Sequence, residues 1–277
     1  MNIASEIERN VAAALAEDVG SGDYTAQLTP AHAPGRAHVL CRTAATVAGR
    51  PWFDAVFRAL DASTQIEWHV EEGIRVAPGT RLCTVTGEAR TLLTGERAAL
   101  NFLQLLSAVA TVTRTYVDAV AGTQAAILDT RKTLPGLRVA QKYAVKTGGG
   151  MNHRMGLYDG ILIKENHIAA AGGVRAALAE AQRLAPPGVW IQIEVENFEQ
   201  LEEALSADAK LILLDNMSVA QMREAVVKTA GRAKLEASGG ITIENVRDIA
   251  LTGVDRISIG ALTKDVRAVD LSMRFTG

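Results

Sequence analysis

Seven basic side chains fall between positions 131 and 164, where the only acidic residue is Asp159. That segment carries about six net positive charges (seven minus one), whereas the whole chain of 277 residues carries a net charge of −2. A local excess of positive charge favours an anionic partner. Because the basic residues alternate with strand-like and glycine-rich stretches instead of lining one arm, we expect a small anionic ligand and no nucleic acid.

The cations suited to hold such a ligand are Arg131, Lys132, His153, Arg154 and Lys164. Guanidinium groups match the oxygens of a carboxylate or a phosphate in two-point geometry. His153 and His167 lie on different segments and have no third nitrogen or sulfur ligand at the spacing of a zinc site. We therefore expect these histidines to contact substrate or to make structural hydrogen bonds.

Carboxylates and glycines follow the cations along the chain. Glu194 and Asp215 each close a short apolar run, where a carboxylate can accept hydrogen bonds from sugar hydroxyls, hold Mg²⁺ or stabilise a cationic transition state. A salt bridge to a neighbouring lysine is the alternative. The stretches ASGG at 237–240 and IGALT at 259–263 can bring backbone N–H groups close to a phosphate.

The elements that carry these residues alternate between strand and helix after position 122. Six apolar runs, AAILDT, DGILIK, WIQIEV, KLILLD, AKLEAS and DRISIG, are separated by amphipathic stretches at 174–184, 198–207, 218–230 and 243–251. This alternation predicts a parallel sheet with helices outside. The runs end in charged, hydroxyl or glycine residues, which would meet at the mouth of an α/β barrel. Six strands predict an incomplete TIM-like barrel, and no P-loop or dinucleotide fingerprint is present.

The first part of the chain predicts a smaller α+β open sandwich domain. We expect helices at 3–17 and 51–60 and strands at 37–47, 65–70 and 81–86. We place the domain boundaries at 1–107 and 108–265, with the tail 266–277 packed back on the first domain.

A long helix should follow, and because its apolar positions cover most of its circumference we expect it to be buried between layers or subunits. Its N-cap would be Thr94, which puts Arg97 in a first turn where the helix dipole disfavours a cation. A ligand or a partner subunit would then hold Arg97, although an ordinary surface arginine is the alternative.

Composition sets the remaining limits. With 48% hydrophobic and 22% charged residues, the chain can bury a large core. The N-terminal residues do not form a signal peptide, and no run of about 18 apolar residues could span a membrane, so we expect a cytoplasmic protein. Cys41 and Cys83 are far apart in the sequence and predict buried, unreactive thiols.

The central motif LDTRKTLPGLRVAQKYAVKTGGGMNHRMGLYDGILIKENH resembles the quinolinate phosphoribosyltransferase family. The later motifs EVEN, LLDNM, LEASGGIT and SIGALTKDVRAVDLSM and the early segment DVGSGDYT extend the resemblance over essentially the whole chain. The resemblance implies a homodimer with shared active sites, leaves a higher oligomer open, and implies transfer of phosphoribosyl from phosphoribosyl diphosphate to quinolinate with decarboxylation.

The resemblance also assigns roles to residues. The position matching Arg97 reaches into the partner's site. Positions matching Arg131, Lys132, His153, Arg154 and Lys164 hold the substrate carboxylates and the diphosphate. Those matching Glu194 and Asp215 bind the ribose hydroxyls and, with the substrate, Mg²⁺. The phosphate would contact Ser238, Gly239, Gly240 and Gly260. Thr130, Ile259 and Ala261 complete the expected substrate-binding set, and Lys132, Lys164, Glu194 and Asp215 the catalytic one.

Two alternatives remain at this point. A phosphoribosyltransferase of the same fold, such as the paralogue associated with molybdenum transport, could act on another anionic acceptor. A non-catalytic protein that binds a phosphorylated sugar is the second.

Overall fold

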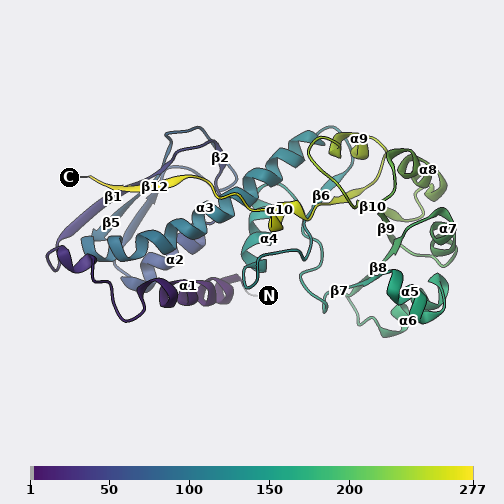
Figure 1. Cartoon of the computed structure of the whole chain (residues 1–277), viewed down its shortest axis with the longest axis horizontal. Helices are drawn as coiled ribbons and strands as arrows, with labels where there is room; N and C mark the ends of the chain where they lie inside the picture. Colours follow the sequence, from purple (N-terminus) through teal and green to yellow (C-terminus); the bar gives the residue numbers. More distant parts are fainter. Residues whose placement is uncertain (1–2, 277) are drawn as a thin grey trace. The chain divides into compact units, whose positions relative to one another are not determined.

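The computed structural model describes residues 3–276 and consists of two compact units (Figure 1). One unit contains residues 3–114, 133–149 and 262–276. The other contains residues 115–132 and 150–261. The boundaries that we place after residues 107 and 265 stay predictions.

The first unit is built on a four-stranded antiparallel sheet in the order β12-β1-β5-β3. Its strands are β1 (Pro34–Cys41), β3 (Gln65–Trp68), β5 (Arg81–Glu88) and β12 (Leu271–Phe275). Its helices are α1 (Ile3–Val19), α2 (Arg50–Leu60), most of α3 (Ala89–Ala119) and α4 (Arg138–Thr147), with the short helix η1 (Ala26–Leu28) and the two-stranded pair β2 (Ala45–Thr46) and β4 (Arg75–Val76). Burial alternates along β1, as expected for a strand with one face on the core. Figure 1 shows α1, α2 and α3 on one side of the sheet.

The core of this unit holds Trp52, Phe53 and Phe57 from α2, all fully buried. Both cysteines are buried free thiols, as predicted. The C-terminal strand pairs antiparallel with β1, from Ala37 opposite Phe275 to Cys41 opposite Leu271. The predicted strand at 37–47 is wrong in its extent, because it is divided into β1 and β2.

The start of the long helix also differs from the prediction. Helix α3 begins at Ala89, directly after β5, because the apolar face continues upstream and Leu92 is fully buried there. Thr94 is therefore not an N-cap; its hydroxyl donates to Asp23 Oδ2 at 2.9 Å. Arg97 lies in the third turn and is exposed, so the expectation that the helix dipole disfavours it is wrong.

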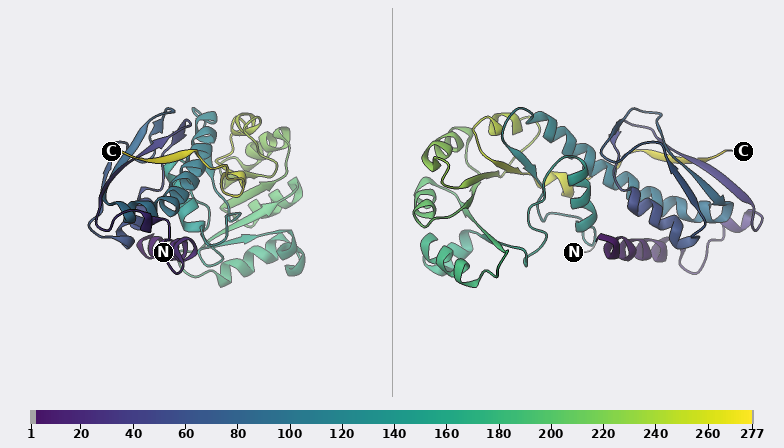
Figure 2. Two further views of the ribbon diagram at one scale, coloured as in Figure 1. Left: turned by 60° about the vertical axis from the view of Figure 1, so that its left-hand side comes forward. Right: turned by 180° about the vertical axis from the view of Figure 1, so that it is seen from behind.

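The second unit is a six-stranded parallel sheet in the order β6-β11-β10-β9-β8-β7. Its strands are β6 (Ala126–Leu128), β7 (Gly160–Ile163), β8 (Trp190–Val195), β9 (Leu211–Asp215), β10 (Lys234–Ser238) and β11 (Arg256–Ser258). Its helices are α5 (Glu165–Ala171), α6 (Val174–Leu184), α7 (Phe198–Ser206), α8 (Val219–Thr229) and α9 (Val246–Ala250), and α10 (Ala261–Lys264) begins at its last residue. The helices lie outside a curved sheet (Figure 2).

This arrangement confirms the incomplete barrel. Strands that follow one another in the chain are neighbours from β7 to β11, and the last strand, β11, pairs with the first, β6. The sheet stays open between β6 and β7, its two edge strands, as in an incomplete α/β barrel. The predicted strand cores all form, and the predicted helices form with shifts of up to three residues at their ends. Helix α9 starts late, at Val246, because the Asn245 side chain accepts from the Thr242 N–H at 2.9 Å and closes a turn.

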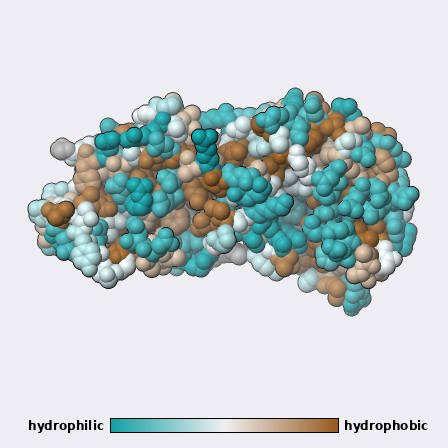
Figure 3. Space-filling view, in the orientation of Figure 1, coloured by the Kyte–Doolittle hydropathy of each residue, from teal (hydrophilic) through white to brown (hydrophobic). Residues whose placement is uncertain are grey.

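Within residues 3–276, none of the helices is both long and apolar enough to cross a membrane. On the face drawn in Figure 3, hydrophobic residues are interspersed with hydrophilic ones over both units.

Candidate active site

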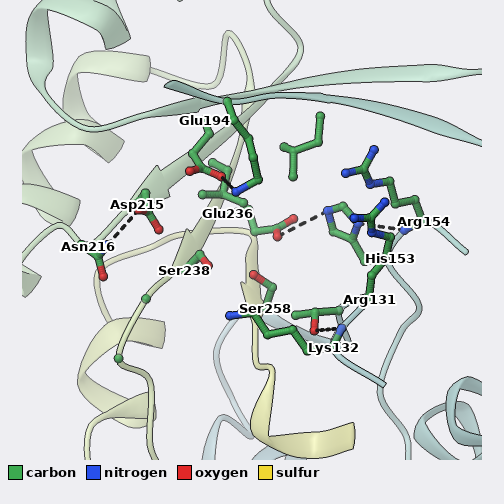
Figure 4. A pocket seen from close by; sticks show the side chains of 16 residues that line it. Arg131, Lys132, His153, Arg154, Glu194, Asp215, Asn216, Glu236, Ser238 and Ser258 are labelled. Atoms are coloured by element: carbon green, nitrogen blue, oxygen red, sulfur yellow. Dashed lines mark hydrogen bonds and ion pairs between the residues drawn. The ribbon is translucent and has the colours of Figure 1, made fainter. Parts of the chain in front are cut away.

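A cavity of about 540 Å³ opens at the carboxyl ends of the parallel strands (Figure 4). We call it the strand-end cavity, and all of its lining belongs to the second unit. It brings together the predicted residues Thr130, Arg131, Lys132, His153, Arg154, Lys164, Glu194, Asp215, Ser238, Gly239 and Gly240. Leu162, Leu213, Asn216, Glu236 and Ser258 complete its lining.

Four predicted residues are not among those that line it. Ile259, Gly260 and Ala261 lie just after β11, and a Cβ added to Gly260 would lie 3.1 Å from Lys132 Cδ. Gly260 therefore packs against the stem of a lysine in the lining. Arg97 belongs to the first unit and is exposed there.

One wall of the cavity carries two arginines that differ in burial. Arg131 is exposed, whereas Arg154 is only 9% exposed and donates from Nη1 to Gly160 O at 2.9 Å. Burial, with a smaller contribution from the neighbouring charge of Arg131, lowers the pKa of Arg154 from its ordinary value. An arginine remains charged at neutral pH despite such a shift. A buried cation beside an exposed one can therefore receive an anion with little reorganisation.

The loop that presents Arg154 is tied to the end of β6 by Asp129. This carboxylate is fully buried and accepts from the His153 N–H at 2.9 Å and from Asn152 Nδ2 at 2.5 Å. A parallel bridge joins Leu128 to Met151. On the other side of the loop, Asp159 accepts from the N–H groups of Met155 and Gly156 at 2.7 and 2.8 Å. The loop is thus held on both sides of the arginine.

His153 makes hydrogen bonds through both ring nitrogens. Nδ1 accepts from the Arg154 N–H at 2.8 Å, and Nε2 lies 3.0 Å from Gln192 Oε1. Because an amide oxygen only accepts, the ring hydrogen is assigned to Nε2. Gln192 Nε2 in turn donates to Glu236 Oε2 at 3.1 Å. The ring of Trp190 stands edge-on to His153, with centroids 5.0 Å apart.

The second histidine, His167, makes a structural hydrogen bond. Its Nδ1 accepts from the Lys164 N–H at 3.0 Å, which closes the first turn of α5. Within residues 3–276, no group of three or more histidine, cysteine, aspartate or glutamate side chains is placed to hold a metal ion.

Lys164 and Glu194 form an ion pair at the ends of neighbouring strands, with Nζ 3.0 Å from Oε2. Burial raises the pKa of Glu194 above its ordinary value, and the charges of Asp215 and Glu165 raise it further, while Lys164 opposes the shift. Asp215 accepts from Asn216 Nδ2 at 2.8 Å. Mg²⁺ is usually held by one or two carboxylates together with substrate phosphates, so Glu194 and Asp215 fit a site completed by the substrate.

The end of β10 forms a glycine turn beside Asn216. Gly239 has φ +97°, and a Cβ there would overlap the Asn216 amide. Gly240 has φ +58° and open space around it, and its carbonyl accepts from Asn245 Nδ2 at 3.0 Å. Backbone can thus approach a ligand closely at both positions.

Strand periodicity contained a signal for several residues that the sequence interpretation missed. Residues two apart in a strand point to the same face. Glu236 lies two positions before Ser238, and Ser258 two before Gly260. Gln192, which hydrogen-bonds to Glu236, lies two before Glu194. Counting two positions back from each strand-end residue would have identified Glu236, Ser258 and Gln192.

Comparison with known proteins adds two family matches. The model of the quinolinate phosphoribosyl transferase C-terminal domain matches residues 109–274. That of the N-terminal domain of the same family matches residues 23–107.

Individual relatives agree with these matches. The chain is 46% identical over 270 residues to the nicotinate-nucleotide pyrophosphorylase [carboxylating] of Mycobacterium leprae, covering 94% of each chain. It is 40% identical over 281 residues to a mitochondrial quinolinate phosphoribosyltransferase [decarboxylating] of Nicotiana glauca, covering 94% of this chain and 80% of the relative. The solved nicotinate-nucleotide pyrophosphorylase of Francisella tularensis superposes with a TM-score of 0.95 at 41% identity, covering 99% of this chain and 97% of that one.

Proposed function

The chain belongs to the quinolinate phosphoribosyltransferase family, and we propose that the strand-end cavity is where it transfers phosphoribosyl from phosphoribosyl diphosphate to quinolinate. Membership confirms the resemblance seen in the sequence. The activity is quinolinate phosphoribosyl transfer with decarboxylation, a step of NAD biosynthesis. The products are nicotinate mononucleotide, diphosphate and CO₂. One observation carries the assignment to this cavity: it places a pair of arginines and a pair of carboxylates around one space.

The arginines provide the acceptor half of the site. Arg131 and Arg154 hold the two carboxylates of quinolinate, since each guanidinium can donate two parallel hydrogen bonds to one carboxylate. Lys132 adds a third cation beside Gly260. Both ring nitrogens of His153 already have hydrogen-bond partners in the protein, so we assign it to the support of Arg154.

The carboxylates and glycines provide the donor half. Glu194 and Asp215 accept hydrogen bonds from the ribose hydroxyls and face the positive charge that develops at C1′. Ser238, Gly239 and Gly240 face the 5′-phosphate of the phosphoribosyl group. We place Ile259, Gly260 and Ala261 near the same phosphate. Glu194 and Asp215 would help to hold Mg²⁺, which when bound would supply positive charge that stabilises the leaving diphosphate.

The reaction then needs little proton chemistry at its first step. The pyridine nitrogen carries its own lone pair and forms a bond to C1′ as the bond from C1′ to the diphosphate oxygen breaks. The ring nitrogen is then cationic and can stabilise the electron pair that CO₂ leaves at C2, which afterwards takes a proton. The task of the protein is to hold the two substrates in line and to balance their charges.

We also propose a homodimer in which Arg97 reaches the site of the partner subunit. The family resemblance supports this role, and the exposure of Arg97 is compatible with it.

A direct assay tests the function. Purified protein is incubated with quinolinate, phosphoribosyl diphosphate and Mg²⁺, and nicotinate mononucleotide and CO₂ are measured. We expect both products in equal amounts and neither after chelation of the metal. Turnover with nicotinate and none with quinolinate would contradict the acceptor assignment, and binding of phosphoribosyl diphosphate without turnover of any acid would favour a non-catalytic protein.

A further inference from the structure

We propose that Glu236 is a positioning residue for the acceptor half of the strand-end cavity, acting on Arg154 through Gln192 and His153. The inference rests on the function proposed above. It concerns a residue in the middle of β10, upstream of the glycine turn.

Glu236 is an acidic side chain buried in the wall of a site for anions. It is 1% exposed, yet it lines the strand-end cavity and faces His153 in Figure 4. One oxygen, Oε2, accepts from Gln192 Nε2 at 3.1 Å. The other, Oε1, is buried, has no hydrogen-bond partner among residues 3–276 and lies 3.7 Å from His153 Nε2. A buried acceptor without a donor costs stability, so its retention calls for a functional explanation.

The Glu236 carboxylate determines the direction of each hydrogen bond in the network that runs through Gln192 and His153 to Arg154. An ionised carboxylate only accepts, so Gln192 must turn its amide nitrogen toward Glu236. The amide oxygen then faces His153, which must carry its ring hydrogen on Nε2. Nδ1 is left as an acceptor and receives the Arg154 N–H at 2.8 Å.

The second oxygen of Glu236, Oε1, favours the same Nε2–H tautomer of His153. A negative charge 3.7 Å from His153 Nε2 favours any state in which that nitrogen carries a hydrogen. The alternative tautomer, with the hydrogen on Nδ1, would place two donors against each other at the Arg154 N–H. Glu236 therefore stabilises the tautomer that holds this segment of backbone.

This hydrogen-bond network positions Arg154. Its backbone N–H is held by His153 and its guanidinium by Gly160 O, so it is positioned from both ends. In the proposed function Arg154 holds one quinolinate carboxylate. Loss of the carboxylate at position 236 should weaken quinolinate binding without changing the phosphoribosyl half.

The test substitutes Glu236→Gln, which keeps the shape but introduces an amide that can donate as well as accept. The tautomer of His153 is read in ligand-free protein by ¹⁵N NMR, with its signal identified by its absence in His153→Asn. Quinolinate affinity and the KM for phosphoribosyl diphosphate are measured on the same samples. We expect a gain of the Nδ1–H tautomer, quinolinate binding weaker by on the order of tenfold, as for lost outer-shell partners of metal-bound histidines, and an unchanged KM for phosphoribosyl diphosphate.

A matched control is Glu180→Gln on α6, an exposed carboxylate paired with Arg183, which should change none of these quantities. If Glu236→Gln does not fold, the double variant Gln192→Met and Glu236→Met takes its place, because it removes both ends of the buried Gln192–Glu236 hydrogen bond together. It also removes the Gln192 acceptor of His153 Nε2. The same mixed tautomer and weakened binding are expected.

Folded variants that keep the parent's tautomer and bind quinolinate like the parent would overturn the proposal. A changed tautomer with unchanged quinolinate affinity would also overturn it, because the carboxylate would then be structural only. A parent that binds no quinolinate would instead contradict the proposed function, and the NMR measurement would still decide whether Glu236 controls His153.

Discussion

Lys164 Nζ lies 3.0 Å from Glu194 Oε2, and the two residues come from the ends of adjacent parallel strands. The lysine side chain is 45% exposed and the glutamate side chain only 9%. Burial outweighs the lysine, so the pKa of Glu194 is raised. The site therefore keeps a carboxylate that is costly to ionise at the place where the proposed reaction develops positive charge.

We predict an unusual pH dependence for Glu194→Gln. Because the folded pKa of Glu194 is raised, its contribution to the free energy of unfolding is fully present below its unfolded pKa and is lost as the pH rises through the folded pKa. The stability of the parent relative to the variant should thus fall as the pH rises from the ordinary range of a glutamate pKa through the raised folded pKa. Urea unfolding at several pH values measures this difference.

Glu180→Gln provides a control of opposite sign. Hydrogen bonding to Arg183 lowers the pKa of Glu180, so the contribution of Glu180 should be lost as the pH falls, and it should be small because the pair is exposed. If the two substitutions showed the same trend with pH, the burial argument for Glu194 would fail.

Gly239→Ala should impair phosphoribosyl diphosphate binding and stability together. An alanine at this position must adopt φ +97°, and its Cβ overlaps the Asn216 side chain. The comparison is Gly188→Ala, with φ +87° and open space, which should cost only the backbone strain of roughly 1–2 kcal/mol. We expect a larger loss of unfolding free energy for Gly239→Ala, measured by denaturant titration. Equal losses would show that Asn216 moves aside easily.

Arg131→Ala and Arg154→Ala should each weaken quinolinate binding by roughly 1.5–3 kcal/mol, the scale of a hydrogen bond to a charged group. Calorimetric titration measures it, and the exposed Arg183→Ala on α6 is the control. Arg154→Lys should recover only part of the loss, because a lysine lacks the planar fork. If both alanine variants bound quinolinate like the parent, these arginines would not form the acceptor half.

Arg97→Ala should inactivate the enzyme through the partner subunit. Mixing Arg97→Ala subunits with Lys164→Ala subunits, each inactive alone, should restore part of the activity, since one site of the mixed dimer has both residues intact. Heterodimers isolated with two affinity tags provide the material. Proven heterodimers without activity would argue against shared sites.

The sequence predicted the strand-end residues well and the helix start badly, for one physical reason. Strand ends are marked by a local change from apolar to polar residues, as at Glu194 and Asp215. The start of α3 carries no such mark, since β5 passes into the helix without a polar loop. Thr94 had the chemistry of an N-cap, but its hydroxyl bonds to Asp23 instead.

Glu236 shows which contacts could not be predicted from the sequence. Its place in the cavity could be inferred from its spacing to Ser238, but its unpaired oxygen and its link to His153 join β10 to a loop more than 80 positions away in the chain. Such contacts depend on how the parallel strands align beside each other. A one-residue shift in register would turn each of these side chains to the other face of the sheet.

By itself, the sequence determined the family, the succession of parallel strands and the set of cations, carboxylates and glycines at their ends, because these follow from residue type and periodicity within short segments. The tertiary structure alone decided which of them share one cavity, how far Arg154 and Glu194 are buried, and which partners each ring nitrogen of His153 meets. Burial and hydrogen-bond direction arise from neighbours that are distant in sequence.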